Sequence, residues 1–253
     1  MWFNITVISV LGFLAAAVDA IAGGGGLISL PALLFVGVPP HMALGTNKFA
    51  STCASLNSSV TYARSGKTYL PLVKWQIIFT FFGAVLGVIS VLALSSDFLN
   101  KAVLIMILAV GIYTLARKNL GMHDNFQGLT SRKIAIGCCF ALLLGFYDGF
   151  FGPGTGSFLI FCFITIYGFD FLSASANAKA LNFTSNLAAL ILFAWNGKIV
   201  FSFGIPMALA MILGSVCGTK LAIKQGAKLV KPIFVTMSLL VAAKLGYQLF
   251  LNT

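Results

Sequence analysis

Lys48 and Lys179 are the residues of this sequence whose chemistry stands out first, because each lies in a run of uncharged residues of membrane-spanning length. An intramembrane lysine usually faces a cavity or a charged partner. Its long side chain can instead extend back to the membrane surface. We favour the binding of an anion by these ammonium groups, because the two lysines stand 131 residues apart at matching positions of two similar half-chains.

Small polar residues accompany both lysines and would give each helix a polar face. Positions 47, 51, 55 and 58 recur at helical spacing, and so do positions 178, 182, 185 and 186. The polar residues are Thr46, Asn47, Ser51, Ser55, Asn57 and Ser58 in the first helix and Asn177, Asn182, Ser185 and Asn186 in the second. Such a face can hydrogen-bond an oxyanion, and it can equally hold helices together in a bilayer. The residues for which we predict substrate contacts are Asn47, Ser51, Asn177 and Asn182.

Two glycine-rich breaks precede the lysine segments. They are Asp19-Ala20-Ile21-Ala22-Gly23-Gly24-Gly25-Gly26 and Asp148-Gly149-Phe150-Phe151-Gly152-Pro153-Gly154-Thr155-Gly156. Consecutive glycines end a helix, because each loses much backbone freedom on ordering. Short helices beginning after Gly26 and Gly156 would present free N–H groups and a positive dipole end, which attract anions. The alternative is that the glycines only permit tight turns or close packing. The predicted substrate contacts are Gly23, Gly24, Gly25, Gly26, Gly152, Gly154, Thr155 and Gly156.

Asp19 and Asp148 head the two breaks and admit two roles. A buried carboxyl group can titrate near neutral pH and could therefore couple the protein to protons. It can also cap the backbone N–H groups that a helix break leaves free. We favour capping, because it requires no further function of the residue.

Composition indicates an all-α polytopic membrane protein. Of the 253 residues, 59% are hydrophobic and 8% charged, and the mean hydropathy is +1.01. Soluble domains carry about a quarter charged residues, so a membrane class is favoured. The net charge of +11 comes from basic residues scattered between apolar runs. That distribution is typical of cytoplasmic loops and argues against nucleic-acid binding.

Patterns for catalysis or metal binding are missing from the sequence. All five acidic residues are aspartates, and the five cysteines show no Cys-x-x-Cys spacing. Neither a Gly-x-Ser-x-Gly nor a His-Glu-x-x-His motif occurs. We therefore predict no enzyme, no metal and no cofactor. The N-terminus lacks the basic start of a signal peptide, so we expect the first apolar segment to remain in the mature protein.

About 20 apolar residues span a bilayer, and ten apolar segments qualify as full or partial crossings. They are Asn4–Val18, Leu27–Val38, Met42–Tyr62, Leu72–Leu94, Phe98–Ala116, Lys133–Tyr147, Ser157–Tyr167, Ser173–Trp195, Phe201–Ile223 and Leu229–Leu251. The predicted domains are a first membrane repeat (1–117), a cytoplasmic linker (118–131) and a second membrane repeat (132–253).

The two halves repeat in order. Besides the lysines, Gly66-Lys67 matches Gly197-Lys198, and the helix-packing pair Gly83 and Gly87 matches Gly214 and Gly218. Five crossings or partial crossings in each half predict that the second repeat is inverted, a common transporter plan with the site at broken helices. Basic loops around Arg64, Arg132 and Lys224 predict the cytoplasmic side, which leaves both termini periplasmic. Whether the broken helix pairs span fully or re-enter stays open.

The glycine breaks and lysine segments resemble the TauE/SafE sulfite-exporter family, most closely its YfcA-like branch. The resemblance is carried by Asp19 to Leu27, Pro31-Ala32-Leu33, Gly45-Thr46-Asn47-Lys48, Gly145 to Ser157 and Ala176 to Asn186. It implies secondary transport of sulfur-containing anions such as sulfite, sulfonates or sulfoacetate, and it fixes neither the substrate nor the direction.

The function that we predict is an alternating-access carrier of a small oxyanion in a bacterial inner membrane. The anion would lie between the breaks, neutralised by Lys48 and Lys179. The rival interpretations are a passive anion channel and a non-transporting membrane scaffold. The expected partners are a small anionic substrate and the lipid bilayer but no nucleic acid, and a homodimer is left open.

Overall fold

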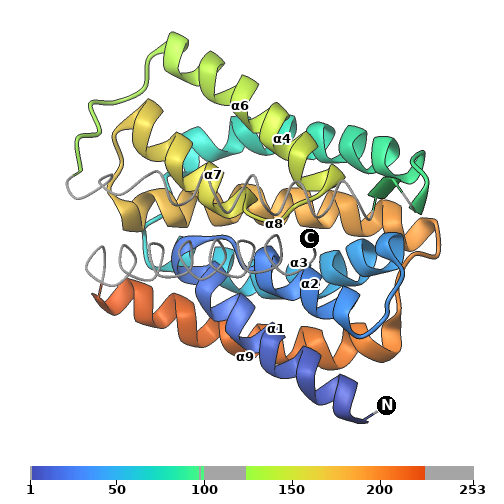
Figure 1. The fold of residues 1–253 in the computed structure, drawn as a ribbon. Helices are drawn as coiled ribbons and strands as arrows, with labels where there is room; N and C mark the ends of the chain where they lie inside the picture. Colours follow the sequence, from blue (N-terminus) through green and yellow to red (C-terminus); the bar gives the residue numbers. More distant parts are fainter. Residues whose placement is uncertain (1, 97, 100–123, 226–253) are drawn as a thin grey trace, which may run out of the picture.

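The computed structural model describes residues 2–96, 98–99 and 124–225, which form helices and, within these ranges, no strand (Figure 1). The elements are α1 (Trp2–Ala22), α2 (Gly26–Phe35), α3 (Pro40–Arg64), α4 (Leu70–Leu92), α6 (Ser131–Phe150), α7 (Thr155–Cys162), the π-helical turn η1 (Phe163–Tyr167), α8 (Phe171–Trp195) and α9 (Phe201–Gln225). The predicted all-α membrane fold is confirmed.

Some predictions fall outside the described residues. These are the segment Leu229–Leu251, nearly all of Phe98–Ala116 and residues 118–123 of the linker. The rest of the linker, residues 124–130, is non-helical and leads into α6. The division into two repeats with boundaries at residues 117 and 131 stays a prediction.

Four of the described helices, α1, α4, α6 and α9, are long and apolar enough to cross a membrane. Each presents large apolar side chains outward, for example Leu14, Phe82, Leu143 and Leu209. Such exposed side chains are stable only against lipid or another apolar surface. These helices therefore form the outer part of the described structure.

The two polar helices, α3 and α8, lie at the centre. Each has 25 residues and carries one of the intramembrane lysines, Lys48 in α3 and Lys179 in α8. They pack against each other, while α3 also packs against α9 and α8 against α4. Polar side chains facing lipid would be costly, so burial of both helices between apolar neighbours is the favourable arrangement.

The helix breaks are shorter than the sequence suggested. Helix α1 continues to Ala22 and α6 to Phe150, so Asp19 and Asp148 lie inside the last turns of these helices and not in the breaks. The turns themselves contain residues in the left-handed region that favours glycine, with φ values of 73° at Gly23 and 97° at Gly152. The glycines are therefore required by the backbone at these positions.

In each broken pair, the first helix is of membrane length and the second is about half as long. Helices α1 and α6 have 21 and 20 residues, which at 1.5 Å per residue measure about 30 Å. Helix α2 has 10 residues, and α7 has 8 before it passes into η1. In both pairs the second helix turns back toward the side from which the first entered (Figure 1).

Packing between the outer helices is reciprocal. Helix α4 packs on α6, and α9 packs on α1. A methyl group added at Gly83 would overlap the backbone carbonyl of Leu142, and one added at Gly214 would overlap that of Phe13. Gly83 of the first half-chain contacts Leu142 of the second. Gly214 of the second half-chain contacts Phe13 of the first, so the two contacts are equivalent with the halves exchanged. The predicted role of these glycines in close helix packing agrees with both contacts.

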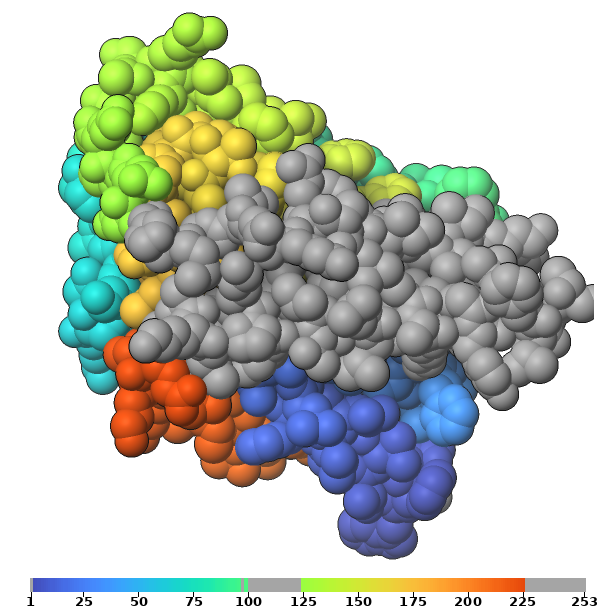
Figure 2. All heavy atoms as spheres, turned by 60° about the vertical axis from the view of Figure 1, so that its left-hand side comes forward, coloured from blue at the N-terminus to red at the C-terminus, as the bar shows by residue number. Residues whose placement is uncertain are grey.

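The directions of equivalent helices are opposed. Helix α1 runs from right to left in Figure 1 and α6 from left to right, and α3 and α8 are opposed in the same way. Figure 2 shows α6 and the loop before it at one end of the molecule, with α1 and α9 at the other. These opposed directions support the predicted inversion of the second repeat.

Candidate functional site

The two helix breaks meet at the centre of the described structure. A Cβ atom placed on Gly23 would overlap the backbone of Gly156 and Ser157, so the first break crosses directly over the start of α7. The Ser157 hydroxyl donates to the Ala22 carbonyl at 3.3 Å. The close approach requires glycine at both positions and brings the ends of four helices together.

Side chains from other helices satisfy the last carbonyls of α1. The Tyr62 hydroxyl donates to the Ala20 carbonyl at 2.8 Å, and the Ser175 hydroxyl donates to the Ile21 carbonyl at 3.2 Å. A helix that ends within a membrane leaves such carbonyls without water, so each needs a partner from the protein. Side chains of α3 and α8 therefore stabilise the end of α1 at the break.

Each intramembrane lysine forms an ion pair with the aspartate of the opposite half-chain. Lys179 Nζ lies 2.5 Å from Asp19 Oδ2, and Lys48 Nζ lies 2.9 Å from Asp148 Oδ2. Because Lys48 matches Lys179 and Asp19 matches Asp148 in the repeat, the two pairs are equivalent with the halves exchanged. The sequence prediction assigned both lysines to the anion and did not pair them.

The surroundings of the two ion pairs differ. Asp148 and Lys48 are both 2% exposed, and Lys48 Nζ also donates to Asn186 Oδ1 at 3.0 Å. Lys179 is fully buried, whereas the Asp19 side chain is 24% exposed. Capping was favoured for both aspartates. Asp19 Oδ1 accepts a hydrogen bond from the Gly25 N–H at 3.1 Å, whereas among the described residues no backbone N–H donates to Asp148, which pairs with Lys48.

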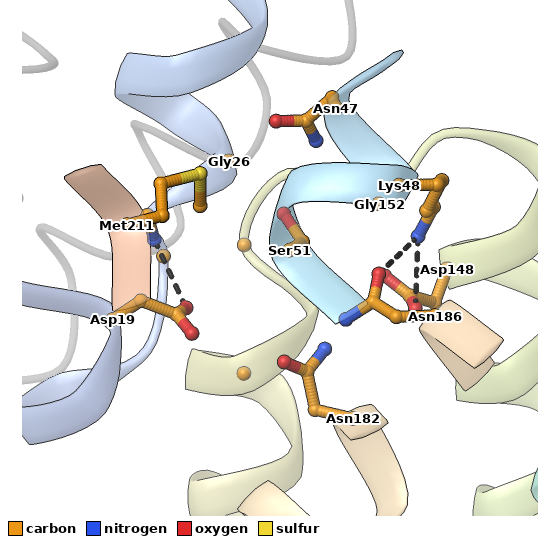
Figure 3. A pocket seen from close by; sticks show the side chains of 14 residues that line it. Asp19, Gly26, Asn47, Lys48, Ser51, Asp148, Gly152, Asn182, Asn186 and Met211 are labelled. Carbon is orange, nitrogen blue, oxygen red and sulfur yellow. Dashed lines mark hydrogen bonds and ion pairs between the residues drawn. The ribbon is translucent and has the colours of Figure 1, made fainter. Parts of the chain in front are cut away.

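A pocket opens between the two breaks (Figure 3). Its cavity volume is about 30 Å³, which is room for about two water molecules. The residues that line it are Asp19, Gly24, Gly25, Gly26, Asn47, Lys48, Ser51, Asp148, Gly152, Gly154, Gly156, Asn182, Asn186 and Met211. The lining is mainly polar.

Several polar groups at this pocket have no partner within the described residues. The side chains of Ser51 and Asn182 form no hydrogen bond there, although they are equivalent in the repeat and come from α3 and α8. The Oδ1 atom of Asn47 is buried and unpaired. Buried polar groups are normally satisfied, so unpaired donors and acceptors in a pocket indicate water or a ligand.

The charges around the pocket cancel. Two ammonium groups face two carboxylate groups in the two cross-paired contacts, so a further anion does not meet an unbalanced positive charge. Within the described residues no group of three metal-ligating side chains occurs. The donors that remain for an anion are neutral hydroxyl and amide groups and backbone N–H groups.

Twelve of the sixteen residues predicted at the site line the pocket, and four do not. The four are Gly23, Thr155, Asn177 and Lys179. Gly23 lies at the crossing of the breaks, the Thr155 hydroxyl donates to the Gly152 carbonyl at 2.7 Å, and Lys179 lies behind Asp19.

Asn177 has a position that its sequence context did not suggest. Its Oδ1 accepts from the Tyr69 N–H at 2.7 Å, just before α4 begins. The equivalent residue Thr46 accepts from the Val200 N–H at 2.9 Å, just before α9 begins. Both side chains therefore hold the entry of an outer helix of the opposite half and face away from the pocket.

Two pocket residues, Asn186 and Met211, were absent from the predicted site. Asn186 belongs to the polar face that was identified on α8, so helical spacing could have placed it at the site, whereas its contact with Lys48 depends on the packing of α3 against α8. Met211 lies on α9 and carries no pattern that separates it from other apolar residues of that helix.

Comparisons with known proteins agree with one another. The family model described as Sulfite exporter TauE/SafE matches residues 8–245. A "Probable membrane transporter protein" of Haemophilus influenzae is 40% identical over 96% of this chain and 95% of its own length. The "Probable membrane transporter protein YfcA" of Escherichia coli K12 is 38% identical over 96% of this chain and 89% of its own length.

A more distant relative extends the same relationship. The "Probable membrane transporter protein YunE" of Bacillus subtilis is 24% identical over 97% of both chains. No solved structure matches. The family match spans nearly the whole chain and includes both glycine breaks and both lysines, so the chain belongs to the TauE/SafE sulfite-exporter family of membrane transporters.

Proposed function

We propose that this protein is a secondary transporter of small organosulfur or sulfur oxyanions that works by alternating access. The observation that carries the proposal is the pocket between two reciprocal helix breaks, bordered by Asp19 and by the Lys48–Asp148 pair. Broken helices at the interface of two repeats are the usual place of a transporter's substrate site. Sulfite, sulfonates and sulfoacetate are the proposed substrates, in keeping with the family.

The chemistry of the pocket supports an oxyanion. A sulfonate or sulfite group accepts several hydrogen bonds and donates few. The hydroxyl of Ser51 on α3 and the amide of Asn182 on α8 can both donate, and neither has another partner among the described residues. The amide nitrogen of Asn186 is also available, because Asn186 uses its oxygen to accept from Lys48. Hydrogen bonds to a charged ligand are stronger than those between neutral groups.

Reciprocal packing supports alternating access. The pairs α4–α6 and α9–α1 each join one half-chain to the other through close backbone contacts at glycines. Each pair can therefore move as a unit against the polar helices α3 and α8. In inverted-repeat transporters, such movement opens a fixed central site to one side and then to the other. We propose the bacterial inner membrane as the location, with both termini periplasmic.

Anion flux into proteoliposomes tests this function. We expect saturable uptake of labelled sulfite, methanesulfonate or sulfoacetate, together with exchange when unlabelled anion is trapped inside. The Lys48→Ala/Lys179→Ala variant should transport at least tenfold more slowly. The control is Lys67→Ala/Lys220→Ala, which removes the same charge from two exposed positions and should transport like the wild type.

The same experiment separates the alternatives. A flux that stays linear far above millimolar anion and shows no exchange would indicate a passive channel. No flux of any of the three anions would contradict the proposed transport and favour a scaffold. Wild-type flux in the double lysine variant would exclude the lysines from the site.

A further inference from the structure

We propose that Asp19 is the proton-coupling group, so that the anion is bound together with one proton on the Asp19 carboxylate. This inference rests on the proposed transport of an anion and adds its coupling ion and stoichiometry. It rests on the different exposure of two ion pairs, Lys179–Asp19 and Lys48–Asp148, that occupy matching positions of the two half-chains.

Asp19 is the carboxylate that a proton can reach. Its side chain is 24% exposed and borders the pocket, while its partner Lys179 is fully buried. The equivalent carboxylate of Asp148 is 2% exposed, as is its partner Lys48. Asn186 adds a hydrogen bond to Lys48, and Gly152 lies against both charged groups. Both pairs border the pocket, but only the Asp19 carboxylate is partly exposed, so a proton reaches the first pair more readily than the second.

The balance of charge requires a compensating ion. With both pairs intact, the centre has no net charge, and a monoanion entering it would bring one unbalanced negative charge into a low-dielectric environment. A proton that binds Asp19 Oδ2 neutralises that carboxylate and leaves the charge of Lys179 unpaired. The anion in the pocket then balances the charge of Lys179 across the neutral Asp19 carboxyl group, and the loaded site is again neutral. The substrate and the proton thus favour each other's binding.

The described helices that pack around Asp19 bring few other titratable groups to it. Lys179 faces it from α8, and Lys48 and Tyr62 lie on α3, where the Tyr62 hydroxyl donates to the Ala20 carbonyl. Helix α2 has no ionisable side chain, and α7 has only Cys162 at its far end. The charged residues of α9, Lys220 and Lys224, are exposed at its C-terminal end.

Proton uptake on anion binding provides the test. Purified protein in weakly buffered detergent solution is mixed with methanesulfonate, whose single charge does not change between pH 5 and pH 8. We expect about one proton to be taken up per anion bound by the wild type, with an affinity that falls up to tenfold per pH unit as pH rises. In proteoliposomes, an inward proton gradient should drive accumulation of the anion.

The matched variants are Asp19→Asn and Asp148→Asn. Asp19→Asn should bind the anion without proton uptake, with an affinity independent of pH, and should exchange anion without accumulating it. The Asp148→Asn variant should still take up one proton with each anion that it binds. Anion binding without proton uptake by the wild type, or proton uptake by Asp19→Asn, would overturn the inference and leave the transport function standing. Absence of binding and flux for methanesulfonate, sulfite and sulfoacetate would overturn both.

Stability of the variants does not limit the test. If Asp19→Asn fails to fold, the proton uptake of the wild type and its response to a proton gradient still decide the matter. Accumulation that follows membrane potential and ignores the proton gradient would contradict coupling through a neutral loaded site.

Discussion

Lys179 of α8 and Asp19 of α1 lie 160 residues apart in the sequence and form an ion pair of 2.5 Å at the centre of the membrane domain. Lys48 and Asp148 form the equivalent pair with the half-chains exchanged. The two contacts tie each glycine break to the polar helix of the other half. Both half-chains contribute to the site, so neither half can form it alone.

Breaking the buried Lys48–Asp148 pair should cost more stability than breaking the Lys179–Asp19 pair, in which the aspartate is partly exposed. Asp148→Ala leaves Lys48 buried and uncompensated, and removing one partner of a buried pair typically costs about 3–5 kcal/mol. Asp19→Ala should cost less, because water can enter from the pocket toward Lys179. Thermal unfolding in detergent measures both variants. A larger loss for Asp19→Ala would contradict the difference in burial.

Replacing both residues of the Lys48–Asp148 pair should separate the effect on stability from the effect on transport. Lys48→Met/Asp148→Leu removes both charges, and apolar replacement of a buried ion pair is often neutral or stabilising. We expect the thermal midpoint of this variant to lie close to that of the wild type, well above that of Asp148→Ala. Anion flux should be lost. Full flux with both charges gone would show that this pair serves the fold alone.

The neutral donors of the pocket should set affinity for the anion. Ser51→Ala or Asn182→Ala removes one hydrogen bond to a charged ligand, worth about 1.5–3 kcal/mol, or roughly a tenfold to hundredfold rise in KM. The control is Ser90→Ala on α4, where the hydroxyl is exposed and donates to the Leu86 carbonyl. Concentration-dependent flux measures KM, and an unchanged value in both pocket variants would exclude these contacts.

Asn177→Ala should weaken the fold and spare the pocket. It removes the acceptor of the Tyr69 N–H, which is partly buried, and a fully buried backbone group left unsatisfied costs about 1–3 kcal/mol, so the loss should lie at or below the lower end of that range. The thermal midpoint should fall, while KM of the folded protein should not change. A rise in KM without a loss of stability would return Asn177 to the substrate site.

Close packing at equivalent glycines predicts equivalent defects. A methyl group at Gly87 would overlap the Phe146 carbonyl, and one at Gly218 would overlap the Ala17 carbonyl. Overpacking typically costs about 1–3 kcal/mol, which exceeds the roughly 1 kcal/mol that alanine gains in helix propensity. Gly87→Ala and Gly218→Ala should therefore lower the thermal midpoint by similar amounts. A rise in either variant would show that the helices can separate freely.

The sequence by itself determined the class of the protein and most of the pocket. Low charge and high hydropathy leave a bilayer as the only favourable environment for these helices. Consecutive glycines place the breaks, and helical spacing places Asn47, Ser51 and Lys48 on one face of α3. These are local properties, so composition and periodicity are sufficient to predict them.

Only the tertiary structure decided how the charges are used. Spacing could not show that Lys179 meets Asp19, because that contact depends on how α8 packs against the end of α1. It could not separate Asn177 from Asn182 either, since both lie on α8 and only the neighbouring elements decide which amide holds Tyr69 and which faces the pocket. The matching sequence positions of Asp19 and Asp148 gave no sign that the two side chains differ in exposure. The different exposure of Asp19 and Asp148 arises from packing across the halves, which no single segment encodes.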